Sequence, residues 1–334
     1  MSEVISGISR EAQQIKRAAL TAKEIFISPH KPARTQSLII IGFSSVIPEQ
    51  VRESGILSNP QRIRAVDVAE QYMIALNDRV DIEGAKKADL EDLVADTKQR
   101  EQRWRSKLDE ALTNLPPEER ERVRRNVEMG IKEVEFVEDW IRNKRDGEGV
   151  NFQDVDIYRT MVNAISNVAL SSLIFGPGSL ENRIRPIKGN MDIQSIIDKY
   201  AWVTGRNPQK EIERGVMISH NIAMVVQMMN DWRGRDYDRI LNIPSYTLSV
   251  LSSVDNNEKM AKVWLDDERD KYMERAADLG IGKLATIVPV ALSDIFIFAH
   301  KFLAKSGRDH AWVRDKVAKW PMGLREKAYM NRKI

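Results

Sequence analysis

The sequence predicts an all-α protein, organised as a single large helical bundle over residues 1–334. Apolar residues recur at helical spacing along nearly the whole chain, and β-like signals are confined to the short apolar run at residues 38–43. Hydrophobic residues make up 42% of the chain and charged residues 30%, which is typical of a folded, water-soluble globule. At 334 residues the chain is therefore long enough to bury a sizeable core.

Composition excludes several classes of chemistry. The chain has no cysteine, which rules out disulfides, thiolate metal sites and cysteine nucleophiles, and makes a reducing, cytoplasmic location the default expectation. The first residues lack the apolar core of a signal peptide. The longest apolar runs, at 37–47 and 286–299, are shorter than a bilayer crossing, so no transmembrane segment is expected.

The helical pattern divides the chain into successive elements. Beyond the run at 38–43, helices are predicted at residues 63–82, 157–175, 193–203, 209–233, 245–253, 258–279, 283–304 and 312–320. The densely charged stretch 85–140 predicts two amphipathic helices joined at Pro116 and Pro117, as a hairpin insertion or as peripheral helices. Either Asp154 or Asp156 is expected to cap the helix at 157–175.

Two polar clusters interrupt helices that otherwise have a buried pattern. Asp78 and Asp81 are three residues apart, which places both carboxylates on one face of a helix. Asn230, Gly234 and Asp238 are spaced at four-residue intervals and are likewise expected on one face. Carboxylate and amide oxygens are ligands for Mg²⁺, which also binds substrate phosphates. Ordinary ion pairs at exposed helix ends are the alternative interpretation for each cluster.

These clusters resemble the two motifs of the class I terpenoid synthases, the superfamily of squalene and phytoene synthases, terpene cyclases and prenyl transferases. Asn77-Asp78-Arg79-Val80-Asp81 resembles the first, aspartate-rich motif, and Asn230-Asp231-x-x-Gly234-x-x-x-Asp238 resembles the second. The segments Asn242-Ile243-Pro244-Ser245-Tyr246 and Asp156-Ile157-Tyr158-Arg159 are similar to further family segments. The chain departs from the family at Asn77, where an aspartate is common, at Gly234, which replaces a hydroxyl or carboxylate ligand, and at Asp238, which replaces glutamate.

The resemblance implies a Mg²⁺-dependent isoprenoid synthase that ionises a prenyl diphosphate, cyclises or condenses it, and releases diphosphate. The implied metal ligands are Asp78, Asp81, Asn230, Asp231 and Asp238. Candidate diphosphate-binding residues are Arg159, Arg183, Arg185, Arg235 and Arg239, with ordinary surface charge as the alternative. Aromatic side chains that could line the cavity and stabilise carbocations are Tyr72, Tyr158, Phe175 and Trp232, with core packing as the alternative. No single catalytic residue is assigned, and a homodimer is compatible with this interpretation.

A second hypothesis is a non-enzymatic helical binding or assembly protein. Such a protein could package nucleic acid through the basic residues at 120–125 and the loop around Arg183. The sequence has no Glu-x-x-His pair, no Gly-x-x-x-x-Gly-Lys-Ser/Thr loop and no Gly-x-Ser-x-Gly elbow, which disfavours di-iron, nucleotide-binding and serine-hydrolase chemistry. The acidic run from Asp266 to Asp270 lies in a charged helical pattern and is interpreted as a solvated face.

Overall fold

The chain folds into packed helices. The computed structural model describes residues 43–44, 46–83, 91–147, 149–176 and 178–281, and over these ranges it contains helices and no strand, which confirms the predicted all-α class for them. The elements are α3 (Pro48–Glu53), a 3₁₀ turn (Ile56–Ser58), α4 (Pro60–Glu83), α5 (Glu91–Thr113), α6 (Pro117–Asp146), α7 (Phe152–Phe175), α8 (Ile193–Tyr200), α9 (Glu211–Leu241), α10 (Tyr246–Ser253) and α11 (Glu258–Asp278). The helices predicted at 283–304 and 312–320 lie outside the described residues.

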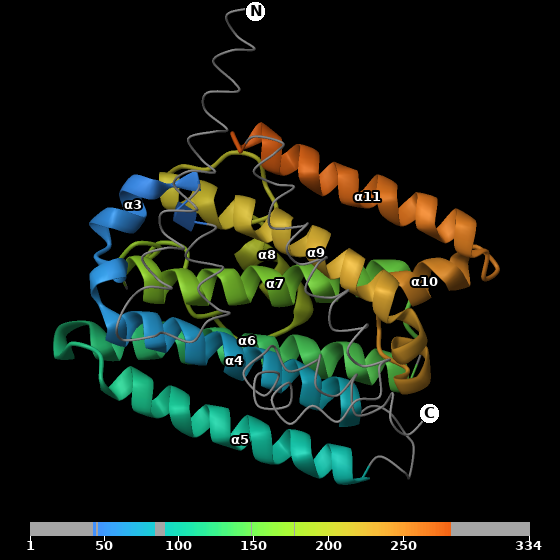
Figure 1. The fold of residues 1–334 in the computed structure, drawn as a ribbon, viewed down its shortest axis with the longest axis horizontal. Helices are drawn as coiled ribbons and strands as arrows, with labels where there is room; N and C mark the ends of the chain where they lie inside the picture. Colours follow the sequence, from blue (N-terminus) through green and yellow to red (C-terminus); the bar gives the residue numbers. More distant parts are fainter. Residues whose placement is uncertain (1–42, 45, 84–90, 148, 177, 282–334) are drawn as a thin grey trace, which may run out of the picture.

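Helix α7 is the central element of the bundle. In Figure 1, α4 and α9 flank α7 in the view, with α5 beyond α4 and α11 beyond α9. Helix α6 packs along α7, and α10 joins α9 to α11. The chain direction is the same in α4 and α9, so the two helices end toward the same end of the bundle (Figure 1).

The pairing of α6 with α7 depends on one apolar stripe and one glycine. The buried stripe on α6, at helical spacing, consists of Val123, Val127, Ile131, Val134, Val137 and Ile141. Within it, Gly130 allows a close approach of the two helices, since a Cβ atom there would lie 2.9 Å from Ala169 Cβ. The charged segment 85–140 thus contributes α5 at the edge of the bundle and a core-facing α6.

The ends of α7 are fixed by side chains that satisfy its free backbone groups. Asn151 is the N-cap and forms a capping box with Asp154, so the prediction that Asp154 or Asp156 is the cap was wrong. At the other end, Arg62 from α4 donates to the carbonyl oxygens of Leu173 and Ile174, both at 3.2 Å. These contacts join the start of α4 to the end of α7.

Helix α9 is longer than its periodicity predicted. It continues past residue 233 to Leu241, where Asn242 adopts a left-handed conformation with φ of 53° before Pro244. Gly234 alone does not break the helix, because tertiary packing offsets the modest cost of an interior glycine. The second polar cluster therefore lies within the last turns of α9 rather than after its end.

Candidate functional site

The first polar cluster occupies the last turns of α4. Asn77 is half-buried, and its Oδ1 atom lies 3.3 Å from the hydroxyl of Tyr158 on α7. The backbone at Asp78 and Asp81 continues the helix, whereas their side chains lie outside the part of the chain that the structure describes. The described side chains of the first motif are Asn77 and Arg79, and Arg79 Nη1 lies 3.1 Å from Glu101 Oε2 on α5.

Tyr158 connects this helix end to α6 and α7. Its side chain is fully buried, and its hydroxyl lies 2.9 Å from Glu138 Oε2, the shorter of its contacts and the one that receives the hydroxyl hydrogen. The guanidinium of Arg159 lies over the Tyr158 ring at 4.7 Å, and its Nη1 atom lies 3.4 Å from the hydroxyl. A buried cation and a buried carboxylate thus meet at one phenol.

Asp231 on α9 contacts Arg159 and so connects the second polar cluster to Tyr158 and Arg159. Its Oδ1 accepts a hydrogen bond from Gln227 Nε2 at 2.6 Å, and its Oδ2 accepts one from the backbone N–H of Tyr246 at 2.9 Å. Arg159 Nη2 lies 3.8 Å from Oδ1 and donates to the carbonyl oxygen of Pro244 at 3.1 Å. Asp231 is only 2% exposed, so its carboxylate anchors the first turn of α10, where a negative charge is favourable.

The two sequence clusters are therefore linked through α7. The contacts run from Asn77 on α4 to Tyr158, to Arg159, and then to Asp231 on α9. Residues 77 and 231 are 154 positions apart in sequence, so no local interaction explains their connection. The two helices end toward one end of the bundle (Figure 1), and the contacts of Asn77, Tyr158, Arg159 and Asp231 join them across it.

The other side chains of the second cluster, Asn230 and Asp238, lie on different sides of α9. Helical geometry turns about 100° per residue, so Asn230 lies about 100° around the helix from Asp231 and about 80° from Asp238, whereas Asp238 lies two turns further along nearly the same line as Asp231. Asn230 is half-buried and Asp238 is buried. Among the side chains that the structure describes, no three His, Cys, Asp or Glu residues lie close enough together to hold a metal ion.

The candidate basic residues occupy different places. Arg183 forms a two-pronged ion pair with Glu213, with nitrogen-to-oxygen distances of 2.9 and 3.2 Å, and Arg185 contacts Asn182. Glu213 is 17 residues before Asn230 on α9, about 25 Å along the helix at 1.5 Å per residue. Arg183 and Arg185 therefore lie far from the motif-bearing end, in contrast to Arg159.

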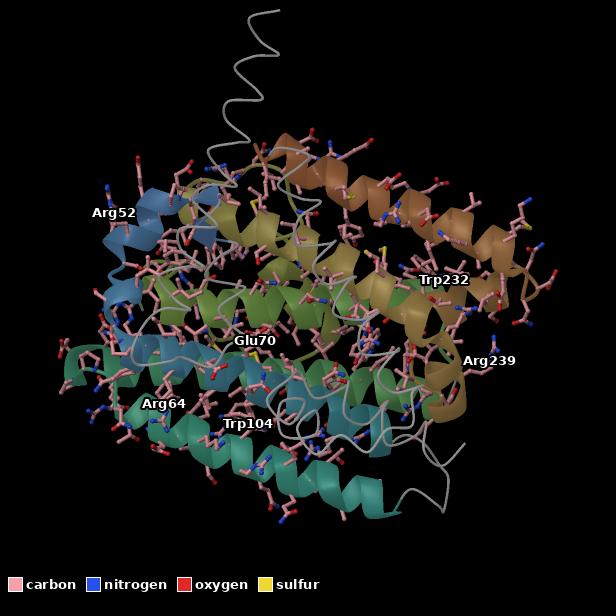
Figure 2. The ribbon with its side chains drawn as sticks, viewed as in Figure 1. Arg52, Arg64, Glu70, Trp104, Trp232 and Arg239 are labelled. Atoms are coloured by element: carbon pink, nitrogen blue, oxygen red, sulfur yellow. The ribbon has the colours of Figure 1, made fainter. Side chains whose placement is uncertain are left out.

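Arg235 and Arg239 lie at the end of α9 that carries the second motif, where Arg235 contacts residues other than Asp231 and Arg239 is exposed. The guanidinium of Arg235 lies 4.7 Å from the centre of the Trp232 ring and contacts Glu258 at 3.4 Å. Arg239 is exposed and extends away from the helices in Figure 2. Of the candidate basic residues, Arg159 is the one in the buried path between the clusters.

The candidate aromatic residues also divide by location. Tyr72 faces α5, with the Arg105 guanidinium 5.6 Å from its ring centre, and Phe175 packs edge-on against Phe43 at 5.1 Å. Trp232 packs against a smaller apolar cluster of α9, α10 and α11. Tyr158 is the candidate aromatic side chain that contacts the first motif.

Several buried polar residues were missed at the level of sequence. Tyr246 donates to Asp156 Oδ1 at 2.9 Å, the Tyr272 hydroxyl lies 3.5 Å from the same atom, and burial raises the pKa of Asp156. Glu138, which contacts Tyr158, is completely buried on α6. The position of Asp156 at the start of an apolar helix was the available signal, whereas Glu138 lies in a charged stretch with nothing to distinguish it.

A third group lies on α4 upstream of the first motif and consists of Asp67, Glu70 and Gln71. Burial raises the pKa of Asp67 to about 7, although nearby Lys107 and Arg64 lower it. Burial, followed by the charge of Asp67, raises the pKa of Glu70 to about 8. The sequence does not distinguish Asp67 and Glu70 from acidic residues on the solvated side of an amphipathic helix, because both occupy the positions between apolar residues.

The basic residues of the nucleic-acid hypothesis have partners within the chain. Arg120 donates to the carbonyl oxygen of Leu115, Arg122 pairs with Glu181 at 2.8 Å, and Arg124 donates to the Thr113 hydroxyl. The pairs of Arg122 with Glu181 and of Arg183 with Glu213 partly neutralise the positive charge that this surface offers to phosphates. The structure thus gives no specific support to this hypothesis.

No protein-family model matches this chain, and neither does any curated protein or solved structure. The resemblance to class I terpenoid synthases accordingly depends on the short sequence motifs alone. Within the described ranges, no helix combines the length and apolar character needed to cross a bilayer.

Proposed function

We propose that this protein is a Mg²⁺-dependent isoprenoid synthase that ionises a prenyl diphosphate and then cyclises or condenses it. The observation that carries the proposal is the polar path from Asn77 through Tyr158 and Arg159 to Asp231. It brings the ends of two distant helices, each with an acidic motif, to one place in an apolar bundle. The substrate class that we propose has a charged head, for the polar side chains, and an apolar tail, for the surrounding bundle.

The residues of the two motifs differ in how well they suit a metal. Both carboxylate oxygens of Asp231 already accept hydrogen bonds, one of them from the buried N–H of Tyr246, so Asp231 does not fit the role of a ligand. We assign Mg²⁺ binding to Asp78 and Asp81 on α4 and to Asn230 and Asp238 on α9, all of which supply oxygen donors. When bound, Mg²⁺ would act as a Lewis acid on the diphosphate oxygens.

The chain's own residues have two further roles in this proposal. Arg159 supplies a buried positive charge between the motifs, and its alignment is held by Asp231 and by the Pro244 carbonyl oxygen. The buried apolar side chains of the three helices, such as Met73, Met161 and Met224, exclude water from the reacting hydrocarbon. Both effects need the packed bundle rather than any single helix.

The test is release of diphosphate from prenyl diphosphates of increasing chain length in the presence of Mg²⁺. The wild-type protein is expected to release diphosphate, and the Asp78→Asn and Asp238→Asn variants are expected to lose most of this activity while their circular dichroism stays helical. The matched control is Asp267→Asn, because Asp267 is exposed in the acidic run of α11. Full activity in Asp78→Asn, or equal loss in Asp267→Asn, would contradict the assignment.

A further inference from the structure

A cavity near the first turn of α9 takes no part in the proposed function. Its volume is about 90 Å³, enough for a few water molecules or one small ion. Glu213, which lines it, is 17 residues before Asn230, so the cavity lies about 25 Å along α9 from the second motif. The polar lining comes from the turn after α7 and from the residues that lead into α9, namely Ser179, Asn182, Arg183, Gln209, Lys210 and Glu213.

Glu213 is the acidic residue of this lining, and partners within the chain already neutralise it. It is only 3% exposed. Its Oε1 accepts from Arg183 Nε at 2.9 Å, and its Oε2 accepts from Arg183 Nη2 at 3.2 Å and from the backbone N–H of Gln209 at 2.8 Å. Because both oxygens are engaged, the role of this carboxylate is to hold Arg183 rather than to bind a cation in the cavity.

Arg183 is held in one orientation and still has donors to offer. Glu213 holds one edge of its guanidinium, and the group lies 5.2 Å from the centre of the Trp202 ring. A guanidinium has five N–H groups, so the Nη1 hydrogens and the second Nη2 hydrogen are left over from the pair with Glu213. A cation that is already aligned loses little side-chain entropy when it binds an anion.

The other polar residues of the cavity add donors and a second positive charge. Asn182 Oδ1 accepts from Arg185 Nη2 at 3.2 Å, so its amide hydrogens are the part of this side chain that can serve a ligand. Lys210 is exposed and is the N-cap residue of α9, which it does not cap through its side chain. With Arg183 and Lys210 positive and Glu213 negative, the lining has an excess of positive charge and of hydrogen-bond donors.

We propose that this cavity binds a phosphate group, either as free phosphate or as the terminal phosphate of a small ester. The donors come from two chain segments, with Asn182 and Arg183 on the first and Lys210 on the second. An anion with tetrahedrally arranged oxygens can accept from both segments at once, whereas a carboxylate presents two oxygens in one plane. The bound phosphate would join the turn after α7 to the start of α9 and so stabilise the folded protein.

The experiment is calorimetric titration of the full-length protein with inorganic phosphate, without Mg²⁺ and at constant ionic strength. Lys210→Gln is expected to weaken phosphate binding by about ten-fold, because it removes one charge-assisted hydrogen bond at an exposed position where the fold is unaffected. Lys259→Gln is the matched control, since Lys259 is equally exposed at the start of α11 and should leave the affinity unchanged.

Tryptophan fluorescence locates the bound anion. Because the guanidinium of Arg183 lies over Trp202, phosphate that binds Arg183 is expected to change the emission of the wild type. Trp202→Phe should lose most of this change and keep the calorimetric affinity. An emission change that persists in Trp202→Phe would place the phosphate elsewhere and overturn the site.

The choice of anion tests the ligand class. Inorganic phosphate and AMP distinguish the two sources, since tighter binding of the first assigns a free anion and tighter binding of the second assigns a phosphate ester. Acetate that binds as tightly as phosphate would overturn the phosphate assignment. No binding of phosphate at millimolar concentration, or equal affinity in wild type and Lys210→Gln, would overturn the site itself. None of these measurements uses a prenyl substrate, so the proposed function stands or fails separately.

Discussion

His220 gives the protein a stability that depends on pH in a defined direction. This residue lies on α9 with no exposed surface, and neither ring nitrogen has a hydrogen-bond partner among the described residues. Burial, followed by the positive charge of Arg275, lowers its pKa to about 4. The ring is therefore neutral in the folded protein throughout the neutral and mildly acidic range.

The size of the effect follows from the difference between folded and unfolded protein. In the unfolded chain a histidine has a pKa of about 6.5, so it takes up a proton well before buried His220 does. Above a pH of about 6.5, His220 therefore does not reduce the free energy of unfolding. As the pH is lowered from there toward about 4, the free energy of unfolding falls by about 3 kcal/mol in all. About 2 kcal/mol of this is lost by about pH 5.

The assay is urea unfolding, followed by circular dichroism, of wild type and His220→Leu at about pH 7.5 and about pH 5. The stability of the wild type relative to His220→Leu should be about 2 kcal/mol lower at the acidic pH, because only the wild type contains the titrating ring. Asp67 and Glu70 have raised pKa values, so they oppose this trend, since their protonation stabilises the folded state. Their contribution cancels because it is common to both proteins.

Met224→Leu is the matched control, since Met224 is equally buried one turn further along α9 and does not titrate. Its stability should follow that of the wild type at both pH values. If wild type and His220→Leu instead change in parallel, the ring is not held neutral by burial. The reasoning from its unpaired nitrogens would then be refuted.

Two further changes test how the bundle is held together. Gly130→Ala is expected to lower the free energy of unfolding by about 1–3 kcal/mol, because the new methyl group would meet Ala169 at 2.9 Å. An unchanged or higher urea midpoint would show that α6 and α7 can separate at little cost. Asp231→Leu is expected to cost about 3 kcal/mol or more, since it leaves Arg159 and the Tyr246 N–H buried without their carboxylate. Asp231→Asn keeps an acceptor and should cost less, so equal losses in the two variants would contradict the capping role.

The helices could be predicted because their apolar stripes are local properties of the chain. The stripe at residues 63–82 lies within α4, and the nearly continuous apolar run at 157–175 lies within α7. The predicted helix ends were less accurate than the predicted helix interiors, because several neighbouring residues were able to act as the cap. Asn151 rather than Asp154 became the N-cap of α7, and α9 continued through Gly234 because its turns on both sides are packed.

The candidate site could be predicted only in outline. The spacing of Asn230, Asp231 and Asp238 predicted a polar cluster on this helix, but it could not show that Asp231 is already bound by the N–H of Tyr246, 15 residues later. That contact exists because the chain reverses at Pro244 and brings the first turn of α10 against α9. Asp67 and Glu70 were not identified at all, since burial by distant parts of the chain distinguishes them from solvated acids.

The sequence by itself determined that this protein is helical, that it has no thiol chemistry, and that two acidic clusters lie on two of its predicted helices. Periodicity and composition suffice for these properties, because each depends on residues within a few turns of one another. Only the tertiary structure decided that Arg159 and Tyr158 lie between the motifs, and that Asp231 anchors a helix. The physical reason is that a helical repeat fixes which residues share a face, whereas the partner of that face comes from packing between segments far apart in the chain.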